Sequence, residues 1–548
     1  MKYKFSETQF NFLLSVVLTI FYNYSFYTKV LHVYPLRSAN ILFLASLAVI
    51  LFLVTNIIIN IILFGISALC KVLKIRVFYK AVLIVIFFLS MLAAYVMDSY
   101  SVVVDDMMFL NIFKTDASEA LDLFSYKLIF YFIFLFVVPA ILILKSRVIH
   151  KTFVTDLLSK LKVSGISLVV IFAILFSMGK FYASFFREQK PLRYYTNPTY
   201  WVYSLGKFGG SLFRNPNRVM EQIGRNSIIP LGDNDRELII LIVGETARRD
   251  RFSLNGYKKE TNPLLKNENV VSFTNVTSCG TSTAISVPCM FSHFGRSKFS
   301  VEDANSTENL LDVLSHTKDV GVLWRDNNSD SKGVAIRAQF EDYKSSALNT
   351  ICDTECRDEG MLVGLQEYID KSQTKDIVIV LHQMGNHGPA YYKRYPKKFE
   401  VFLPVCSTNE LEKCSNEEIG NAYDNAILYT DYFLASVIKL LKDNSSKFNT
   451  GMLYISDHGE SLGENGIYLH GLPYMMAPKE QKEVAMIMWF GGDMDKETNY
   501  VGLRKLINEP YSHDNIFHTI LGMMEIESSA YDPKLDILHD VHIQQTKK

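Results

Sequence analysis

Apolar residues dominate roughly the first 190 positions of the chain. Five apolar runs there are long enough to cross a bilayer, which takes about 20 residues: roughly 9–27, 41–69, 78–97, 127–144 and 165–186. The first run follows MKYK, extends past a usual signal core and lacks a small-x-small cleavage site, so we interpret it as a retained anchor. The pattern predicts a transmembrane domain of five helices over residues 1–186.

Basic residues between these runs set the expected orientation, because Lys and Arg are retained on the cytoplasmic side of a membrane. The connections 71–80 and 145–162 hold four and five of them, whereas 98–125 holds six acidic residues and one lysine. We therefore expect a multi-pass membrane protein with a cytoplasmic N-terminus. Everything after about residue 187 then lies on the far side of the membrane.

Polar and aromatic residues mix in the next stretch, 187–229, before short apolar runs begin to alternate with helical patterns. Arg, Lys, Tyr and Trp together favour the lipid headgroup layer, so we expect an interfacial linker here. An ordinary polar linker is the alternative, because Pro191 and Pro198 interrupt any amphipathic period. The alternation after residue 230 predicts an α/β domain over 230–548 with helices on both faces of a sheet.

Composition narrows the possible partners and the compartment. The 56 basic and 56 acidic residues cancel, so overall charge gives no reason to expect a nucleic acid.

Six of the seven cysteines form close pairs in the predicted outer part: Cys279 with Cys289, Cys352 with Cys356 and Cys406 with Cys414. In an oxidising compartment such pairs indicate disulfides, although sequence does not fix their connectivity. A zinc ribbon is the alternative, but the spacings do not repeat a C-x-x-C knuckle.

Residues able to bind a metal follow three of the apolar runs. ELIILIVGET (237–246) ends near Glu245, DIVIVLHQMGNH (376–387) near His382 and His387, and GMLYISDHGE (451–460) near Asp457 and His458. In open α/β sheets, ligands bind beyond the carboxyl ends of the strands. Glu245, Asp457 and His458 together suit Zn²⁺ in a catalytic role. The Asp-His pair alone would more simply be an ordinary turn.

The segment TSCGTSTAISVPCM (277–290) offers a nucleophile. If the loop after Cys279 runs into a helix, Thr283 lies where backbone N–H groups favour a phosphate. A threonine hydroxyl is a weak nucleophile until a base or a metal activates it, and zinc bound nearby would do so. The alternative is a Ser/Thr-rich helix cap in a secreted loop.

Five ordered motifs resemble the phosphoethanolamine transferases that modify lipid A, a group that includes the mobile colistin-resistance enzymes within the alkaline phosphatase and sulfatase superfamily. They are VGET (243–246), SCGTSTAISVPCMFS (278–292), HQMGNHGP (382–389), SDHGESLGENGIYLHG (456–471) and SHDNIFHT (512–519). The resemblance spans the chain. It implies a central mixed sheet in the soluble domain and an anchor of five helices.

The resemblance also implies roles for particular residues. Thr283 would become modified with phosphoethanolamine and would complete the zinc site with Glu245, Asp457 and His458. His387 and His470 match positions around the bound phosphoethanolamine, where a second zinc is sometimes held and where either histidine can handle a proton. Ser329 and Lys332 match positions that contact the transferred group. Without the resemblance, these would be surface histidines and ordinary loop residues.

A further candidate set lies between the third and fourth apolar runs. Asn111, Thr115 and Glu119 recur every four residues, so on a helix they would share one face. A carboxylate with two neutral polar groups suits the ammonium headgroup of phosphatidylethanolamine, and the resemblance implies substrate binding. The alternative is a solvated amphipathic helix.

This resemblance implies a monomeric, zinc-dependent transferase of the bacterial inner membrane, with its catalytic domain in the periplasm, that moves phosphoethanolamine from phosphatidylethanolamine to the lipid A of lipopolysaccharide. The covalent intermediate would form on Thr283, and the added ammonium group would reduce binding of polymyxins such as colistin. A phosphoglycerol transferase, or an enzyme acting on another envelope glycan such as lipopolysaccharide core, is an alternative because scaffold does not fix substrate. A non-catalytic membrane sensor or assembly protein is the alternative of another class. A sulfatase would need C/S-x-P-x-R, which neither Cys279 nor Cys289 begins.

Overall fold

The computed structural model describes residues 4–73, 78–114, 117–149, 152–212 and 219–541. The chain divides into two compact units. The first comprises Met1–Phe109 and Phe124–Phe213, and the second comprises Leu110–Leu123 and Arg214–Lys548. The short segment Leu110–Leu123 thus groups with the C-terminal part of the chain, although it lies between two apolar helices in sequence.

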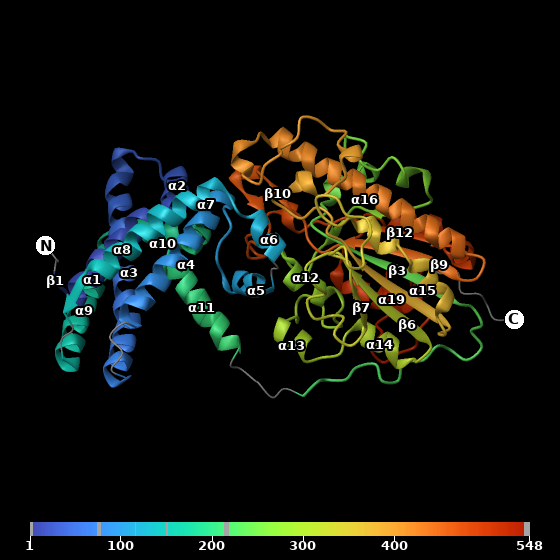
Figure 1. Ribbon diagram of the computed structural model, residues 1–548, viewed down its shortest axis with the longest axis horizontal. Coiled ribbons are helices and arrows are strands. Elements are labelled where there is room, and N and C mark those ends of the chain that lie inside the picture. The colour runs from blue at the N-terminus through green and yellow to red at the C-terminus, as the bar shows by residue number, and fades with distance from the viewer. Residues whose placement is uncertain (1–3, 74–77, 115–116, 150–151, 213–218, 542–548) are drawn as a thin grey trace. The chain divides into compact units, whose positions relative to one another are not determined.

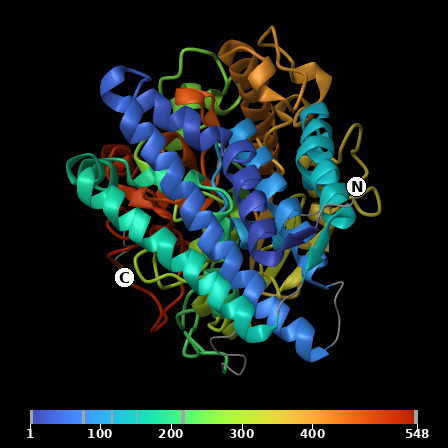
Figure 2. The same ribbon diagram turned by 90° about the vertical axis from the view of Figure 1, so that its left-hand side faces the viewer.

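The first unit is built from apolar helices. They are α1 (Glu7–Phe21), α2 (Tyr24–Val33), α3 (Ser38–Leu73), α4 (Phe78–Tyr100), α7 (Tyr126–Tyr131) continuing through the π-helical η1 (Phe132–Val137) into α8 (Val138–Lys145), and α9 (Phe153–Ser177). Among the described residues, four helical stretches are long and apolar enough to cross a membrane, and α1 with α2, bent by 55°, makes a fifth if the pair is one span. The prediction of five membrane helices is confirmed. Figure 2 shows the long helices α3 and α9 side by side.

The predicted bounds of the last span, 165–186, were wrong. Helix α9 begins at Phe153 and ends at Ser177, where a break separates it from α10 (Gly179–Glu188). Its early start places the charged Lys160 within an apolar helix. The ammonium of Lys160 lies 3.0 Å from a carboxylate oxygen of Glu7 and 3.0 Å from one of Asp156, and this pairing compensates for its burial.

The segment after α10 packs on the first unit as η2 (Lys190–Tyr195) and α11 (Thr199–Leu212). Asn197 fastens it: its N–H donates to Oδ1 of Asn23 (2.8 Å), and its Nδ2 donates to the carbonyl of Ser90 (2.8 Å). Asn23 returns a hydrogen bond to the carbonyl of Asn197 (2.7 Å). The position of this segment at a lipid surface stays a prediction.

The second unit contains a seven-stranded sheet in the order β4-β12-β9-β3-β8-β6-β7. Its parallel strands are β3 (Glu237–Gly244), β6 (Val320–Asp326), β7 (Gln339–Asp342), β8 (Asp376–His382) and β9 (Asn449–Ser456). Strand β12 (Met486–Gly491) runs antiparallel to β9 and to β4 (Val271–Phe273). The predicted mixed sheet is therefore confirmed.

Strand β3 shows how the sequence builds two cores. Side chains alternate between the faces of a strand, so Ile239, Leu241 and Val243 enter one core while Leu238, Ile240 and Ile242 enter the other. Helices α12 (Thr283–Met290), α14 (Leu310–His316) and α19 (Ile516–Met523) contribute to the first core, and α16 (Asn416–Asn444) contributes to the second. Figure 1 shows α16 on one side of the sheet and α14 and α19 on the other.

Shorter elements and three disulfides complete the second unit. The elements are α6 (Ala117–Asp122), β5 (Val276–Thr277), α13 (Val301–Asn305), α15 (Leu365–Lys371), β10 (Ser461–Leu462), β11 (Tyr468–Leu469), α17 (Asp493–Glu497), α18 (Tyr500–Leu506) and β13 (Tyr511–Ser512). Helix α5 (Asp106–Lys114) crosses the boundary between the units. The disulfides join Cys279 to Cys289, Cys352 to Cys356 and Cys406 to Cys414, so the close pairs are bridged, including the 352–356 pair that spacing alone had left open.

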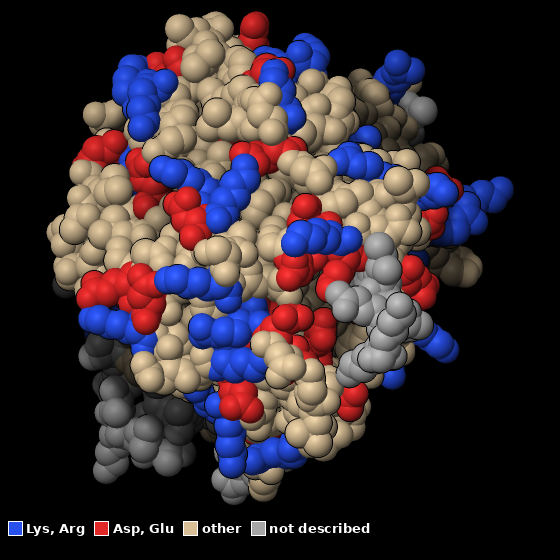
Figure 3. Space-filling model, turned by 90° about the vertical axis from the view of Figure 1, so that its right-hand side faces the viewer, with Lys and Arg blue, Asp and Glu red and all other residues tan. Residues whose placement is uncertain are grey.

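Charged side chains on one face of the second unit are mixed in sign. On the face that Figure 3 shows, Lys and Arg lie among Asp and Glu, with no broad area of a single sign. This agrees with the net charge of zero. A surface that binds a nucleic acid backbone would instead gather basic residues.

Candidate active site

The site forms at one edge of the sheet, where three neighbouring parallel strands end. The register pairs Gly244 at the end of β3 with Ser456 at the end of β9, and Val243 with His382 at the end of β8. The residues that follow these strands must therefore lie close together. The N–H of Thr246 donates to Oδ1 of Asp457 (3.1 Å), which joins the turns after β3 and β9.

Glu245, Asp457 and His458 form a compact group of potential metal ligands. Nε2 of His458 lies 3.2 Å from Oδ2 of Asp457 and 3.5 Å from Oε1 of Glu245. One ligand atom from each residue falls within 4.8 Å of the others, and all three side chains are fully buried. Oε1 of Glu245 and Oδ2 of Asp457 are buried without a hydrogen-bond partner among the described residues, which calls for an explanation.

The electrostatics of this group favour a cation. Burial raises the pKa of Glu245 well above its usual range, and the charge of Asp457 raises it further. Burial also raises the pKa of Asp457 and lowers that of His458 well below its ordinary value. Two buried carboxylates are costly without a counter-charge, and a divalent ion supplies it. Two oxygen donors and one imidazole nitrogen fit Zn²⁺.

Thr283 is the first residue of α12 and faces this group. Its Oγ1 lies 3.2 Å from Oε2 of Glu245 and 3.4 Å from Nε2 of His458. The first amide groups of a helix have no acceptor within the helix and point outward from its end. A phosphate beside Thr283 would therefore meet both the hydroxyl and backbone N–H groups.

A disulfide and a buried histidine hold the loop before Thr283. The Cys279–Cys289 bridge joins the loop to α12. The N–H of Cys279 donates to Nδ1 of His513 (3.2 Å), and Nε2 of His513 donates to the carbonyl of Ser456 (3.0 Å). Burial lowers the pKa of His513 to about 4, so its neutral form can accept at one nitrogen and donate from the other. His513 thereby ties the loop before Thr283 to the end of β9.

Asn328 is a site residue that the sequence analysis missed. Its Nδ2 donates to Oε2 of Glu245 (2.9 Å) and to the carbonyl of Gln383 (2.8 Å), so it orients the carboxylate. It follows β6, whose carboxyl end lies at the same edge of the sheet. Its position just after a strand that ends at this edge was the sequence signal that could have identified Asn328. The sequence analysis considered only its neighbours Ser329 and Lys332 in the same loop.

His387 and His470 lie beside the ligand group. The ring of His470 is 4.2 Å from that of His458 and 5.9 Å from that of His387, measured between centroids. Glu460 holds His470 through Nδ1 (2.7 Å) and accepts a hydrogen bond from the hydroxyl of Tyr391 (2.5 Å). His458, Glu460 and His470 form a second group with metal-ligand geometry. The sequence analysis missed Glu460, although it closes the SDHGE motif.

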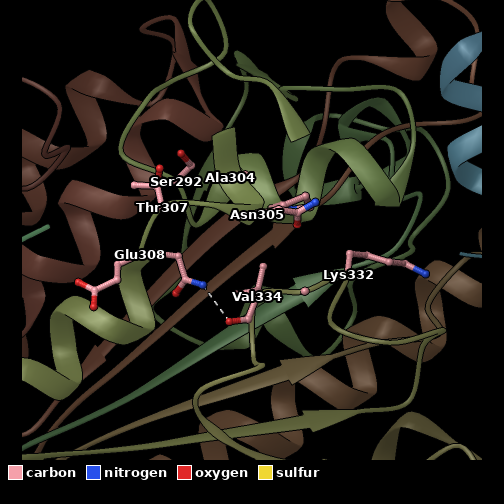
Figure 4. Close-up of a pocket in the computed structure, with 10 residues that line it drawn as sticks. Ser292, Ala304, Asn305, Thr307, Glu308, Lys332 and Val334 are labelled. Carbon is pink, nitrogen blue, oxygen red and sulfur yellow. Dashed lines mark hydrogen bonds between the residues drawn. The ribbon is translucent and has the colours of Figure 1, made fainter. Parts of the chain in front are cut away.

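Ser329 and Lys332 are in contact with each other. The ammonium of Lys332 donates to the carbonyl (3.0 Å) and to Oγ of Ser329, and also to the carbonyl of Lys114 (3.3 Å). Lys332 borders a pocket beside α12 that includes Asn305, and Figure 4 shows its side chain extending away from that pocket. Among the described residues, neither Ser329 nor Lys332 forms a hydrogen bond with the side chain of Thr283.

The structure describes two of the three residues in the face predicted for Asn111, Thr115 and Glu119. Thr115 lies outside the described residues, Asn111 is on α5, and Glu119 is on α6. Glu119 is close to the site, since its Oε1 lies 3.9 Å from Nε2 of His387. A shared face for all three stays a prediction.

Known proteins match both parts of the chain. Residues 237–526 match the Sulfatase family, and residues 61–211 match the family described as Phosphoethanolamine transferase EptA/EptB. The chain is 42% identical over 527 residues to "Phosphatidylethanolamine transferase Mcr-1" of Escherichia coli. The aligned region is 93% of this chain and 94% of that protein. The chain belongs to the phosphoethanolamine transferase family.

Other members of the phosphoethanolamine transferase family match along nearly the whole length. "Phosphoethanolamine transferase EptA" of Escherichia coli strain K12 is 38% identical over 545 residues, 96% of each chain. The solved integral membrane EptA of Neisseria meningitidis matches with a TM-score of 0.91 at 31% identity, over 98% of this chain and 99% of that one. The resemblance inferred from the motifs is confirmed. As a family member, this chain is a membrane-bound phosphoethanolamine transferase.

Proposed function

We propose that this phosphoethanolamine transferase uses phosphatidylethanolamine as donor, lipid A as acceptor and Thr283 as nucleophile, acting as a monomer. The observation that supports this best is the 3.2 Å separation between Oγ1 of Thr283 and Oε2 of Glu245 within a buried group of metal-ligand side chains. An ordinary helix cap would have no reason to face two carboxylates and an imidazole.

The first step forms a covalent intermediate. Oγ1 of Thr283 attacks phosphorus, the bond from phosphorus to the glycerol oxygen breaks, and diacylglycerol leaves after taking a proton. The threonine hydroxyl gives up its own proton, so the products are phosphoethanolamine-threonine and neutral diacylglycerol. The first turn of α12 faces the phosphate, and the backbone N–H groups there stabilise its negative charge.

The second step releases the group to the acceptor. A phosphate oxygen of lipid A attacks the same phosphorus, the bond to Oγ1 breaks, and Thr283 recovers a proton. His387 and His470 are the candidates to deliver it, because both lie beside the ligand group. Glu460 accepts a hydrogen bond from His470 Nδ1 and so presents Nε2 toward the site.

Glu245, Asp457 and His458, with Thr283, would hold Zn²⁺, and a second ion beside His387 and His470 is compatible with the group formed by His458, Glu460 and His470. Bound zinc supplies Lewis-acid chemistry, lowering the pKa of a neighbouring hydroxyl and stabilising charge on phosphoryl oxygens. Asn328 would keep Glu245 oriented whether or not the ion is bound, because it also bonds the chain at Gln383.

Recognition of the donor would use charge at both of its ends. Lys332 and Ser329 would contact the phosphate, and Asn111, Thr115 and Glu119 would contact the ammonium group. The position of Glu119, 3.9 Å from His387, supports an amine headgroup rather than glycerol. A carboxylate there forms an ion pair with an ammonium group, whereas a glycerol headgroup offers it only hydroxyl hydrogen bonds.

A relative and the cysteine content both support the periplasm as the compartment of the second unit. A solved domain of "Phosphoethanolamine Transferase EptC from Campylobacter jejuni", titled as periplasmic, is 41% identical with a TM-score of 0.52 over 58% of this chain and 97% of that one. Three disulfides also favour a periplasmic second unit and an inner-membrane anchor. Adding an ammonium group to lipid A would weaken the binding of cationic polymyxins, including colistin.

The test is transfer in a defined membrane. Full-length protein in nanodiscs containing fluorescent phosphatidylethanolamine and lipid A should release fluorescent diacylglycerol, and lipid A should gain the mass of one phosphoethanolamine. Phosphatidylglycerol in place of the donor should give little product. Faster turnover of phosphatidylglycerol would contradict the donor assignment, and modification of a core sugar in place of lipid A would contradict the acceptor.

A further inference from the structure

Asp122, the last residue of α6, is held by three residues of the second unit. The ammonium of Lys393 donates to its Oδ1 (2.6 Å) and the guanidinium of Arg394 donates to its Oδ2. Nδ2 of Asn409 donates to its backbone carbonyl (2.8 Å). One carboxylate thus pairs with two cations that are consecutive in the chain but 271 and 272 positions away.

Arg394 connects this carboxylate directly to the active site. Its Nε donates to the carbonyl of His387 (2.6 Å), while its two terminal nitrogens bond Asp122 and Glu355. The side chain of Arg394 is 3% exposed, so water cannot replace these partners easily. Displacing Asp122 would leave a buried guanidinium with unsatisfied donors, which is costly.

A second arginine, Arg357, contacts the same ion-pair network as Arg394. Arg357 bonds the carbonyl of Lys393 (2.6 Å) and lies 3.5 Å from Glu355, so Glu355 stands between Arg357 and Arg394. Glu355 itself lies inside the short loop closed by the Cys352–Cys356 disulfide. Contacts other than those to α6 therefore also hold the two cations: Glu355 pairs with Arg394, and Arg357 bonds the backbone of Lys393.

Glu119 is three residues before Asp122 on the same short helix, and residues at this spacing lie on neighbouring parts of a helix surface. While Asp122 is bound, Glu119 lies 3.9 Å from Nε2 of His387. At the start of the segment, Lys332 bonds the carbonyl of Lys114 (3.3 Å). The segment that bears Glu119 is thus fastened at both of its ends.

Asp122 has the charge that this arrangement needs at neutral pH. Burial alone would raise its pKa, but Arg394 and Lys393 outweigh that effect and hold the pKa below its usual value. The ion pair is partly buried, with 10% of the Asp122 side chain exposed, so salt screens it less than a surface pair.

We propose that Asp122 is a positioning residue of the donor site: its ion pairs with Lys393 and Arg394 latch α6 against the His387 loop, so that Glu119 faces the ammonium end of the donor while His387 faces its phosphate. This inference rests on the proposed function. Asp122 does not contact the reacting atoms. It acts through Glu119, while Arg394 keeps its own bond to the carbonyl of His387.

The latch predicts a particular kinetic signature. Releasing α6 removes a contact to the headgroup and leaves Thr283 and the metal-ligand group in place. The loss should therefore appear in KM for phosphatidylethanolamine, and in its preference over phosphatidylglycerol, rather than in kcat. A purely structural role would instead reduce the active fraction and lower kcat equally for both donors.

The experiment compares Asp122→Asn with a matched control, Asp233→Asn, in full-length protein in nanodiscs. Asp233 pairs with Lys375 at 2.7 Å, with 7% and 24% of the two side chains exposed, against 2.6 Å, 10% and 31% for Asp122 with Lys393. Lys393→Met, which removes the more exposed cation alone, covers the case in which Asp122→Asn does not fold. Asp122→Glu tests rescue by a retained charge.

For Asp122→Asn we expect KM for phosphatidylethanolamine to rise about 10-fold with kcat within about 3-fold of the parent. Lys393→Met should give a smaller rise, Asp122→Glu a partial rescue and Asp233→Asn no change. Hydrogen exchange in the peptide containing 117–122 should quicken in Asp122→Asn, less in Lys393→Met and not at all in Asp233→Asn. Unchanged KM and unchanged donor preference in Asp122→Asn, or equal losses of kcat on both donors, would overturn the inference.

These measurements distinguish a wrong donor assignment from a wrong role for Asp122. If the parent protein ignores phosphatidylethanolamine, the proposed donor is wrong, and the exchange experiment still decides whether Asp122 holds α6. If the parent is active and exchange over 117–122 is the same in Asp122→Asn and the parent, the latch is wrong while the donor assignment stands.

Discussion

The hydroxyl of Thr283 lies 3.2 Å from Oε2 of Glu245, although the two residues are 38 positions apart in the chain. The contact exists because β3 ends, and α12 begins, at the same edge of the sheet. His458, from the end of β9, approaches the same hydroxyl to 3.4 Å. A hydroxyl, a carboxylate and an imidazole from three separate elements thus meet at one buried point.

Replacing Thr283 separates its nucleophilic role from its structural one. Thr283→Ala should lower diacylglycerol release by about 10³-fold or more, because no other hydroxyl occupies that position. Thr283→Ser keeps the hydroxyl and should retain a measurable fraction. Both variants should keep the thermal stability of the parent within a few degrees. Equal activity of Thr283→Ala and the parent would exclude this residue as the nucleophile.

Removing metal should destabilise the second unit. Without a cation, the buried carboxylates of Glu245 and Asp457 oppose each other, and a ligand present at 100 times its Kd stabilises a fold by about 2.7 kcal/mol. Chelation should therefore lower the unfolding temperature, and zinc should restore it. Asp457→Asn should bind less zinc, measured by elemental analysis, and respond less to the chelator. A chelator that leaves both the zinc content and the unfolding temperature unchanged would argue for a different ion or none.

The Cys279–Cys289 bridge should matter for catalysis as well as stability. The pair Cys279→Ser with Cys289→Ser should lose about 2–4 kcal/mol of stability, a usual value for a native disulfide. The matched control is Cys406→Ser with Cys414→Ser, which opens a loop of similar length away from Thr283. Both should unfold earlier, but activity at low temperature should fall only in the first, since only that loop positions the nucleophile. Equal activity losses would leave the bridge with a general stabilising role.

A pair of buried carboxyl groups at the other edge of the sheet should give a pH-dependent stability. The N–H of Glu237 donates to Oδ1 of Asp376 (3.0 Å), and burial together with the charge of Asp376 raises the pKa of Glu237 to about 9. The folded state then keeps a proton that the unfolded chain releases above its ordinary pKa of 4.5. Folding stability from this group is highest at low pH and declines as pH rises toward 9, by up to about 1.4 kcal/mol per pH unit.

Glu237→Gln removes that titration while keeping the shape of the side chain. Its free energy of unfolding should decline less than that of the parent between pH 5.5 and 8.5, measured by denaturant titration. The comparison between variant and parent cancels contributions from the metal site, which is unchanged. Parallel pH profiles would show that Glu237 is ionised in the folded protein.

Periodicity and strand-end reasoning were enough to predict much of the fold and the centre of the site. Continuous apolar runs identified β3, β8 and β9, and polar residues directly after them brought Glu245, Asp457 and His458 together. These predictions succeed because the carboxyl ends of adjacent parallel strands converge whatever the loops do.

Other features depend on contacts between distant segments, which no local pattern encodes. Asn328 orients Glu245 from 83 positions away, and Arg394 reaches Asp122 from 272 positions away. The bounds of the last membrane span were wrong for the same reason. Lys160 was counted among the basic residues of the connection 145–162, before the last apolar run, and its partner Glu7 lies 153 positions earlier.

The most direct test of the account is mass spectrometry of the peptide that contains Thr283. Full-length protein with phosphatidylethanolamine and without acceptor should show one phosphoethanolamine adduct on Thr283, absent from Thr283→Ala, together with released diacylglycerol. An adduct on another residue, or diacylglycerol release with lipid A modification and no adduct at any time, would contradict a covalent mechanism through Thr283.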